Sequence, residues 1–535
     1  MKSPFLILAV LAMNCAAQTP PEGDYQISGT VVDHLTNRPL NHVLVQITRT
    51  GKAGGDASIL TQADGNFLFL HVPKGKYQLQ AEKRGRMFEA FHSESGYSTA
   101  IVVDGKQKTD DIMFAMRTDA SINGTVVGDD GEPVRGGQVT LFQEGINNGE
   151  VKTMQAGGST TNSEGRFHLA HLAPGKYYLA TQANPWYSSP SMEMVFPVTF
   201  YGDTTEGSAA RPVMLTEGAI ADIQVVMRAV PGIHVKIANG TRGVGLFIAG
   251  PGGTRIPSSA NYRGLASHFT GKGGRGAMRG APNVAPSQGV EEGEAEMTNL
   301  AAGRYEVVAF GDKGMAAPSQ TVELANGSVL SLDAPVTTVI TGTVLFDSPK
   351  PTGDLDLFLM SKVNGSGVMS VVAPDGTFKF DKIAPGTYSI RLNSPTLMAT
   401  SVTARNARIS NEALEVTQGI SPELTIRVAA SDTLTKLEGI AVRNGESVPG
   451  AMVLLLPRDP GRTLLIRRDQ SDSDGSFSLA GVLPGQYTLV AIDDGAQLAY
   501  KSETVIKPYL EGGTSVTVPS KTGETISVSV QSRKP

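Results

Sequence analysis

One pattern of glycine and tyrosine occurs five times along the chain, and it constrains the fold more than any other feature of the sequence. In every copy a second glycine lies ten residues after the first, and a tyrosine follows the second glycine by two residues. The five sets are Gly65, Gly75 and Tyr77; Gly165, Gly175 and Tyr177; Gly293, Gly303 and Tyr305; Gly376, Gly386 and Tyr388; and Gly475, Gly485 and Tyr487. Repetition at fixed internal spacing indicates five copies of one structural unit.

Each copy contains the signals of two strands joined by a tight turn. The first glycine tolerates the positive φ that a turn between strands requires. Apolar residues then alternate, as at Phe67 and Phe69, before a Pro-Gly turn in which we expect proline to preset φ and glycine to take the left-handed position. A second strand alternates from the tyrosine, as at Tyr77, Leu79 and Ala81. Alternation with period two predicts one buried face, with the tyrosine on it.

A further strand opens four of the copies, and one more strand closes each copy. The opening segments are Gly29–Val31, Gly124–Val126, Gly342–Val344 and the looser Gly439–Val442. About seven short strands in roughly 100 residues is typical of a β-sandwich. We therefore expect an all-β protein with almost no helix, built as a tandem array of about five seven-stranded β-sandwiches.

The repeat also predicts the domain organisation. We expect a signal peptide at 1–17 and sandwiches at 18–118, 119–230, 231–335, 336–430 and 431–535. The third copy departs from the pattern, because it lacks a clear opening G-x-V and has Ala295 where the others have phenylalanine. It also contains a glycine-rich, basic loop at 251–290, for which we expect mobility, with contact to an anionic partner as the alternative.

The N-terminus predicts export. Lys2 precedes an apolar run at 5–12 and small residues up to Ala17, which is the pattern of a short secretory signal cleaved after Ala17. Cys15 is the only cysteine, so a mature chain would contain no disulfide. A second interpretation makes Cys15 a lipid-anchor site, although Asn14 directly before it fits that poorly. No other apolar stretch is long enough to span a bilayer, so we expect a protein of the periplasm, the outer cell envelope or the secreted fraction.

These motifs resemble the carboxypeptidase regulatory-like domain, a transthyretin-like (prealbumin-like) β-sandwich related to the collagen-adhesin B-type repeats. The resemblance rests on the opening G-x-V, on Pro39-Leu40 before the second strand, on the D-G-x-F of 64–67 and on the L-x-P-G-x-Y of 172–177, and it extends over about 25–530. It implies a non-catalytic module with a carbohydrate-binding-like fold, a label that describes shape. The segment 200–215 resembles one that tandem proteins exported by soil bacteria repeat.

The sequence does not predict an enzyme, a cofactor or a metal site. No histidine has a glutamate three residues later, as a zinc carboxypeptidase requires, and there is no G-x-S-x-G nucleophile motif. His168 and His171 are the only close histidine pair, and on a strand they would point to opposite faces, so we expect an exposed His168 and a turn at His171. Aspartates such as Asp472 and Asp474 precede hairpin glycines, where turn formation competes with calcium binding as an explanation.

Four aromatic residues of the second copy form the candidate ligand-binding site. They are Trp186, Tyr187, Phe200 and Tyr201, and Trp186 is the only tryptophan. Exposed rings of this kind stack on sugars or on partner side chains. The alternative is that the four residues cover the end of the second core.

The leading functional hypothesis is an exported, non-catalytic interaction and spacer protein. The expected partner is an extracellular or envelope protein or a polysaccharide. The net charge is −5 without a basic stripe, which argues against nucleic-acid binding. Two alternatives remain open: a carbohydrate-binding protein for extracellular polysaccharide, and an accessory subunit of an exported peptidase or transporter.

Overall fold

The computed structural model describes residues 25–534 except 52–53, 239–242, 264–294, 311–319, 332–336, 347–354, 363–366, 395–396, 411–412, 431–433, 460–461 and 520–525. The predicted signal peptide with Cys15, the turn residue Gly293 and most of the loop predicted at 251–290 lie outside the described residues.

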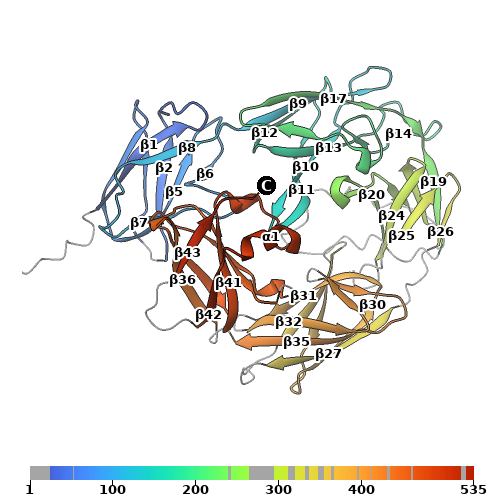
Figure 1. The fold of residues 1–535 in the computed structure, drawn as a ribbon. Coiled ribbons are helices and arrows are strands. Elements are labelled where there is room, and N and C mark those ends of the chain that lie inside the picture. The colour runs from blue at the N-terminus through green and yellow to red at the C-terminus, as the bar shows by residue number, and fades with distance from the viewer. Residues whose placement is uncertain are drawn as a thin grey trace, which may run out of the picture. The chain divides into compact units, whose positions relative to one another are not determined.

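Strands dominate the described residues, which confirms the predicted all-β class (Figure 1). A single α-helix occurs among them, α1 (Glu503–Leu510). The 3-10 turns are η1 (Gly207–Ala209), η2 (Pro251–Gly253), η4 (Thr463–Leu465) and η5 (Gly495–Gln497).

A three-strand arrangement recurs once in every copy of the sequence repeat. The opening strands are β1 (Tyr25–Asp33), β9 (Ala120–Gly128), β19 (Ile233–Ala238), β27 (Thr338–Phe346) and β36 (Thr435–Arg443). Each pairs antiparallel with the strand after the first glycine: β4 (Asn66–Val72), β12 (Arg166–Leu172), β23 (Ala295–Leu300), β30 (Thr377–Ile383) and β40 (Ser476–Val482). Each also pairs parallel with the closing strand: β8 (Ile112–Met116), β17 (Ile220–Met227), β26 (Val329–Ser331), β35 (Glu423–Ala430) and β43 (Ile526–Gln531).

The strand that carries the repeated tyrosine is the centre of a second sheet in the first four copies, and in the fifth copy its sheet is continuous with the first through the closing strand. These strands are β5 (Gly75–Glu82), β13 (Gly175–Gln182), β24 (Gly303–Phe310), β31 (Gly386–Asn393) and β41 (Gly485–Ile492). On one side they pair with β2 (Leu44–Arg49), β10 (Gln138–Asn147), β20 (Gly243–Ala249), β28 (Asp356–Ser361) and β38 (Met452–Pro457). On the other side they pair with β7 (Ile101–Val103), β16 (Val213–Leu215), β25 (Gln320–Leu324), β34 (Ala413–Val416) and β42 (Thr514–Val518).

One outer strand completes a seven-strand scheme in all five copies. The outer strands are β3 (Ala57–Leu60), β11 (Glu150–Thr160), β21 (Arg255–Pro257), β29 (Gly367–Val371) and β39 (Arg467–Gln470). Additional strands are β6 (Glu89–Ala90), β14 (Met194–Val195), β15 (Thr199–Phe200), β18 (Val230–Pro231), β22 (Asn261–Arg263), β32 (Leu397–Arg405), β33 (Arg408–Ser410) and β37 (Glu446–Ser447). The seven-stranded sandwich is therefore confirmed, while the residue boundaries given above stay predictions.

The chain divides into two compact units. The described residues up to Lys83, with Phe88–Phe91 and Ala100–Met116, form the first unit. The second unit contains Arg84–Met87, His92–Thr99 and the chain from Arg117 onward. In both units, each copy of the seven-strand scheme has its own cluster of buried apolar side chains.

A glycine opposite a phenylalanine explains the opening G-x-V and its loss in the third copy. Gly124 faces Phe167 across the strand pair, and a Cβ at Gly124 would lie 2.2 Å from the phenyl ring. The same pairing joins Gly29 to Phe67, Gly342 to Phe378 and Gly439 to Phe477. In the third copy Ile237 faces Ala295. In the third sandwich the large residue therefore lies on the opening strand and the small residue on the strand after the first turn, which is the reverse of the other copies.

The four first glycines of the repeat that the structure describes take positive φ as expected, whereas the second glycines differ from the prediction. Gly65, Gly165, Gly376 and Gly475 have φ between 70° and 87°. Gly75 and Gly175 have no positive φ, and the other three second glycines lie at 152–158° as the first residues of strands. The expected left-handed Pro-Gly turn is therefore wrong, because a β-bulge before the turn supplies that conformation. The bulge residues, with φ between 57° and 66°, are His71, His171, Asn299, Lys382 and Gly481.

The repeated tyrosines connect the core of each sandwich to this turn. All five rings are buried, with exposed fractions between 0% and 7%. Each hydroxyl donates a hydrogen bond of 2.7–2.9 Å to the carbonyl oxygen four residues earlier, at Pro73, Ala173, Ala301, Ala384 and Leu483. Burial raises the pKa of Tyr305 and of Tyr388 to about 12, so these hydroxyls remain donors. The prediction of a core-facing tyrosine with its hydroxyl at the edge is confirmed.

Truncation of one such tyrosine tests how independent the sandwiches are. Tyr487→Ala should lower the free energy of unfolding by about 3–5 kcal/mol, because it removes a buried ring. Tyr487→Phe should cost about 1–2 kcal/mol, because it leaves the Leu483 carbonyl without its donor. Hydrogen exchange should show lost protection within 431–535 alone. Loss of protection along the whole chain would contradict modular folding.

A double-mutant cycle tests the exchange of large and small residues in the third copy. Gly124→Ile should cost about 1–3 kcal/mol by overpacking, and Phe167→Ala about 3–5 kcal/mol by leaving a cavity. Their combination recreates the arrangement of Ile237 and Ala295, so it should cost at least about 1 kcal/mol less than the sum. Hydrogen exchange over 119–230 provides the measurement. Gly124→Ile combined with Phe378→Ala in the fourth copy is the control and should be additive.

Candidate functional site

The structure separates the four aromatic residues of the predicted binding site into two groups. Trp186 is 84% exposed, and its ring meets that of Tyr187 edge to face with centroids 5.7 Å apart. Phe200 is completely buried, and the partly buried Tyr201 packs against the second core. Trp186 and Tyr187 can therefore contact a ligand from the surface, whereas the ring of Phe200 faces the interior.

Phe200 lies in an apolar cluster shared by the second and third copies of the repeat. It belongs to β15, which pairs with β13, and its neighbours include Phe142 of β10 and Ile256 of β21. Because β21 is the outer strand of the third sandwich, this cluster covers the outer face of the second sandwich with residues of the third. The two sandwiches therefore share an apolar joint.

The loop that carries Trp186 is held by local hydrogen bonds. Pro185 is buried, and its carbonyl oxygen accepts a bond from the Ser188 amide. The Ser188 hydroxyl accepts a 3.0 Å bond from the amide of Met194, at the start of β14. Ser189 and Met192 exchange backbone hydrogen bonds. We call residues 184–193 the tryptophan loop; it presents an exposed indole on an ordered backbone.

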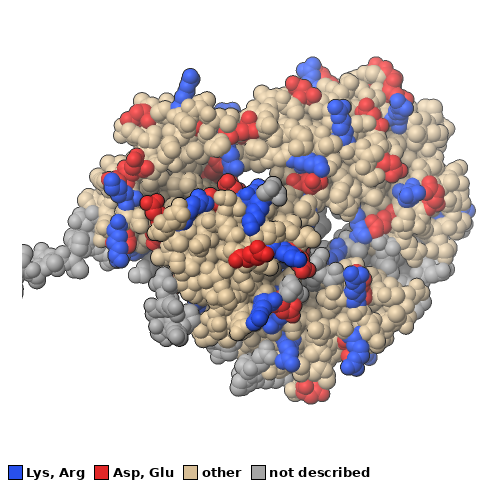
Figure 2. Space-filling view, viewed as in Figure 1, with Lys and Arg blue, Asp and Glu red and all other residues tan. Residues whose placement is uncertain are grey.

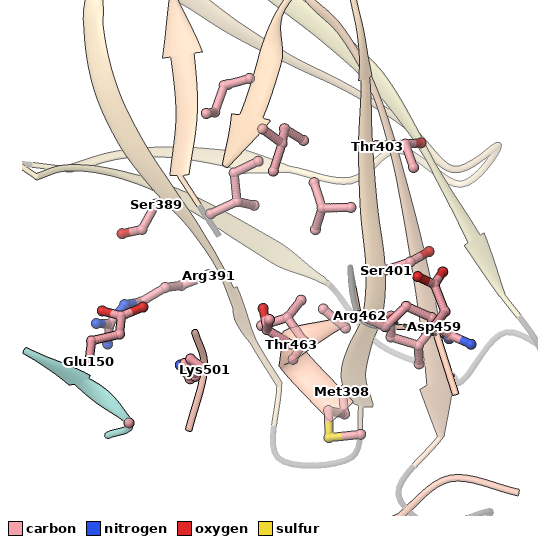
Figure 3. A pocket seen from close by; sticks show the side chains of 18 of the residues that line it. Glu150, Ser389, Arg391, Met398, Ser401, Thr403, Asp459, Arg462, Thr463 and Lys501 are labelled. Carbon is pink, nitrogen blue, oxygen red and sulfur yellow. Dashed lines mark hydrogen bonds between the residues drawn. The ribbon is translucent and has the colours of Figure 1, made fainter. Parts of the chain in front are cut away.

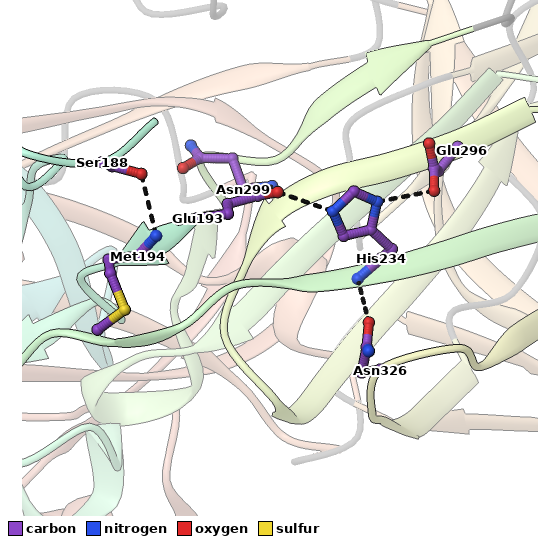
Figure 4. A network of polar contacts seen from close by, with 7 residues as sticks. All are labelled: Ser188, Glu193, Met194, His234, Glu296, Asn299 and Asn326. Atoms are coloured by element: carbon purple, nitrogen blue, oxygen red, sulfur yellow. Dashed lines mark hydrogen bonds and ion pairs between the residues drawn. The ribbon is translucent and has the colours of Figure 1, made fainter. Parts of the chain in front are cut away.

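Glu193, at the end of the tryptophan loop, reaches the third sandwich and meets a histidine there (Figure 4). Its Oε2 lies 2.8 Å from Nε2 of His234, which follows the first residue of β19. Nδ1 of the same ring lies 2.8 Å from Oε1 of Glu296 on β23. The other oxygen of Glu193 accepts a 2.7 Å bond from the amide of Asn299. One imidazole thus lies between two carboxylates from different sandwiches.

The charge state of His234 follows from these neighbours. The hydrogen bond with Glu296 raises the pKa of His234 above its ordinary 6.5, partial burial acts in the opposite direction, and the bond with Glu193 adds to the rise. Two carboxylates close to one imidazole favour the protonated ring. His234, Glu193 and Glu296 were not predicted as a site, because 41 and 62 residues separate His234 from its two partners and no local motif links them.

A large cleft in the second unit is lined by residues of the fourth and fifth copies and by the end of the β10–β11 hairpin (Figure 3). Its volume is about 1760 Å³, and its described lining has more cationic than acidic side chains. The cations are Arg391, Arg408, Arg427, Arg462, Arg467 and Lys501, and the acids are Glu150, Asp459 and Glu503. The excess of positive charge would suit an anionic group.

Arg467 shows that part of this charge has a structural role. Its guanidinium donates to the carbonyl oxygens of Leu464, Ile466 and Gly481 at 2.8–3.0 Å, and burial lowers its pKa. Arg462 donates a longer bond of 3.4 Å to the carbonyl of Thr400. These arginines tie β39 and η4 to their neighbours. Over the visible face as a whole, acidic and basic side chains are interspersed (Figure 2).

A second, smaller hollow lies on the outer face of the sheet formed by β12, β9 and β17. Its volume is about 830 Å³. A row of polar side chains crosses it: Nδ1 of His168 lies 2.8 Å from Oδ1 of Asn123, whose amide donates a 3.1 Å bond to Asp222. His168 is exposed, as predicted. A row of donors and acceptors of this kind can bind a hydroxyl-rich ligand.

The other polar residues singled out in the sequence occupy turns. His171 is exposed at a β-bulge, with its ring nitrogen 2.6 Å from Asp119. Asp474 and Asp130 accept bonds from the amides two residues later, at Ser476 and Glu132. Within the described residues, no three His, Cys, Asp or Glu side chains are grouped to hold a metal ion, and no helix is long and apolar enough to span a membrane.

The carboxypeptidase regulatory-like domain family matches residues 26–112 and 121–194. These two segments contain the repeat motif of the first and second copies. No curated protein has a significant match to the chain.

Several solved bacterial proteins are similar to parts of the chain. The minor pilin GBS52 of Streptococcus agalactiae is 17% identical over 39% of this chain and 97% of its own, with a TM-score of 0.22. The TIE protein of Bacillus anthracis is 11% identical over 77% and 74%, with a TM-score of 0.18. The major pilin subunit BcpA of Bacillus cereus is 11% identical over 58% and 99%, with a TM-score of 0.16. Similarity at this level assigns no function to the chain.

Two alanine substitutions test the division of the aromatic residues. Phe200→Ala should cost about 3–5 kcal/mol, because the ring is completely buried. Trp186→Ala should change stability by less than about 0.5 kcal/mol, because its ring is in solvent. Hydrogen exchange over 119–335 measures both. Equal costs for the two variants would mean that Trp186 contributes to the structure as much as Phe200 does.

Proposed function

We propose that this chain, whose first two sandwiches are carboxypeptidase regulatory-like domains, is an exported, non-catalytic interaction and spacer protein of the cell envelope or the secreted fraction. The sandwiches space and orient a contact surface, and the partner is an extracellular or envelope protein or a polysaccharide.

The exposed ring of Trp186 is the observation that carries this proposal. An indole offers a large apolar face, and burying it against a partner gives a large gain in free energy. Tryptophan and tyrosine are also enriched among the residues that dominate protein interfaces. The hydrogen bonds within the tryptophan loop preorganise the backbone, which reduces the entropy lost on binding.

The spacer role is supported by the use of polar groups within the sandwiches. The five repeated hydroxyls close turns, and the aspartates before the hairpin glycines bind backbone amides. These groups stabilise strands and turns. Polar residues that bind backbone groups in this way favour a structural spacer over an enzyme, in which polar residues would converge on a substrate.

Carbohydrate binding is the second candidate function, and two observations favour it. The indole of Trp186 is free to stack on a sugar ring, and the row of His168, Asn123 and Asp222 can exchange hydrogen bonds with hydroxyl groups. The role of an accessory subunit remains a third candidate. A neighbouring gene for an exported peptidase or transporter would favour it.

Binding by variants of the exported chain tests the contact surface. The mature chain should capture an envelope protein, or it should bind a polysaccharide on a glycan array. Trp186→Ala should weaken that capture at least about tenfold, as loss of an interface hot spot does. Met214→Ala is the matched control, because Met214 is another apolar side chain of the second sandwich and is 67% exposed.

Equal losses in the two variants would mean that Trp186 has no special role. Unchanged capture by Trp186→Ala would contradict the contact surface. N-terminal sequencing of the exported chain separates the two export routes: a start at Gln18 supports cleavage after Ala17, and a lipid on Cys15 supports an anchored protein.

A further inference from the structure

Two carboxylates contact His234, and only the protonated ring can donate a hydrogen bond to both. Both ring nitrogens lie 2.8 Å from a carboxylate oxygen, one from Glu193 and one from Glu296. A neutral imidazole has one N–H and one lone pair, so it can donate to one carboxylate only. The protonated ring donates to both. Deprotonation would leave a lone pair facing a carboxylate and remove one of the two bonds.

This contact holds one end of the tryptophan loop on the third sandwich (Figure 4). Glu193 bonds to His234 and to the amide of Asn299, as described above. At the other end of the loop, Oδ1 of Asn184 accepts a 3.2 Å bond from the side chain of Asn299. Trp186 and Tyr187 lie between these two anchors. The surface around Trp186 is therefore composite: the second sandwich supplies the aromatic rings, and the third sandwich holds the loop.

The joint itself has attachments that do not depend on His234. β14 pairs with β18, the amide of Gly232 donates to the carbonyl of Glu193, and the Phe200 cluster is apolar. The two sandwiches therefore remain joined when the histidine loses its proton. The Glu193 side chain is the attachment that responds to pH.

We propose that protonated His234 locks the Glu193 side chain between the second and third sandwiches, and that deprotonation of this histidine loosens that attachment, so that the tryptophan loop is held most firmly at lower pH. The contact role of the surface rests on the function proposed above; the lock does not.

The charged groups around His234 set the direction of this switch. Glu193 comes from the tryptophan loop and Glu296 from β23. Lys236 of β19 is the register partner of Glu296 on one side. The two acids raise the pKa of His234 above 6.5. The lock is therefore complete below pH 6.5 and is lost as the pH rises through the raised pKa of the folded protein.

Trp186 provides a direct readout, because the chain has no other tryptophan. Time-resolved fluorescence anisotropy of the full-length mature chain should show slow indole motion at pH 5.5 and faster local motion at pH 8.5. Histidine is the only side-chain type whose ordinary pKa lies inside this range. Hydrogen exchange, corrected for the intrinsic rate, should show lower protection at the Asn299 amide at the higher pH.

Three substitutions assign the transition to the proposed contact. His234→Gln should give fast indole motion at both pH values. Glu193→Gln should reduce the difference between the two pH values, because an amide can donate to the neutral ring. His171→Gln is the matched control, since it removes a histidine–carboxylate pair, with Asp119, from the second sandwich, which carries the tryptophan loop. This control should retain the wild-type transition.

An indole signal that is independent of pH in the wild type would overturn the lock. A transition that persists in His234→Gln would overturn it as well. The function proposed above fails by a different result, which is unchanged partner capture by Trp186→Ala. A pH transition in the loop together with unchanged capture would support the lock and reject the contact surface.

Discussion

The structure of each sandwich depends on one hydrogen bond that links the core to a turn. The repeated tyrosine begins a core strand, and its hydroxyl binds the carbonyl four residues earlier, before the turn. The ring contributes apolar burial, and the hydroxyl satisfies a carbonyl that the bulged hairpin leaves without a strand partner. A mature chain cleaved after Ala17 would have no cysteine, so this link would act without the support of a disulfide.

Much of this architecture could be predicted from the sequence because it is local. The ten-residue spacing between glycines places a turn, a strand and a second turn in order, and alternation identifies the buried face. The conformation of the turn could not be predicted in the same way. His71, Lys382 and Gly481 occupy the same left-handed position with unrelated side chains, so no residue type marks the bulge. The conformation is imposed by the strand register on both sides.

The candidate site was only partly predictable, because exposure and long-range pairing are not local properties. Trp186 and Phe200 look alike in sequence, yet the first is 84% exposed and the second is completely buried. Phe200 lies in a cluster that combines residues of its own sandwich with Ile256 of the third sandwich. The contact of His234 with Glu193 likewise forms only when two sandwiches meet. The joint between the second and third sandwiches combines an apolar cluster with a carboxylate–imidazole contact.

The exchange of residue sizes in the third sandwich has a consequence for how the repeats can be recombined. Tandem copies of similar sequence invite gene conversion and unequal crossing-over. A crossover inside a sandwich, between its opening strand and the strand after its first turn, would combine halves from different copies. Joining the third copy with any other would place Ile237 against a phenylalanine, or Ala295 against a glycine. One hybrid clashes and the other has a void, so the third copy is isolated from exchange with its neighbours and is free to diverge.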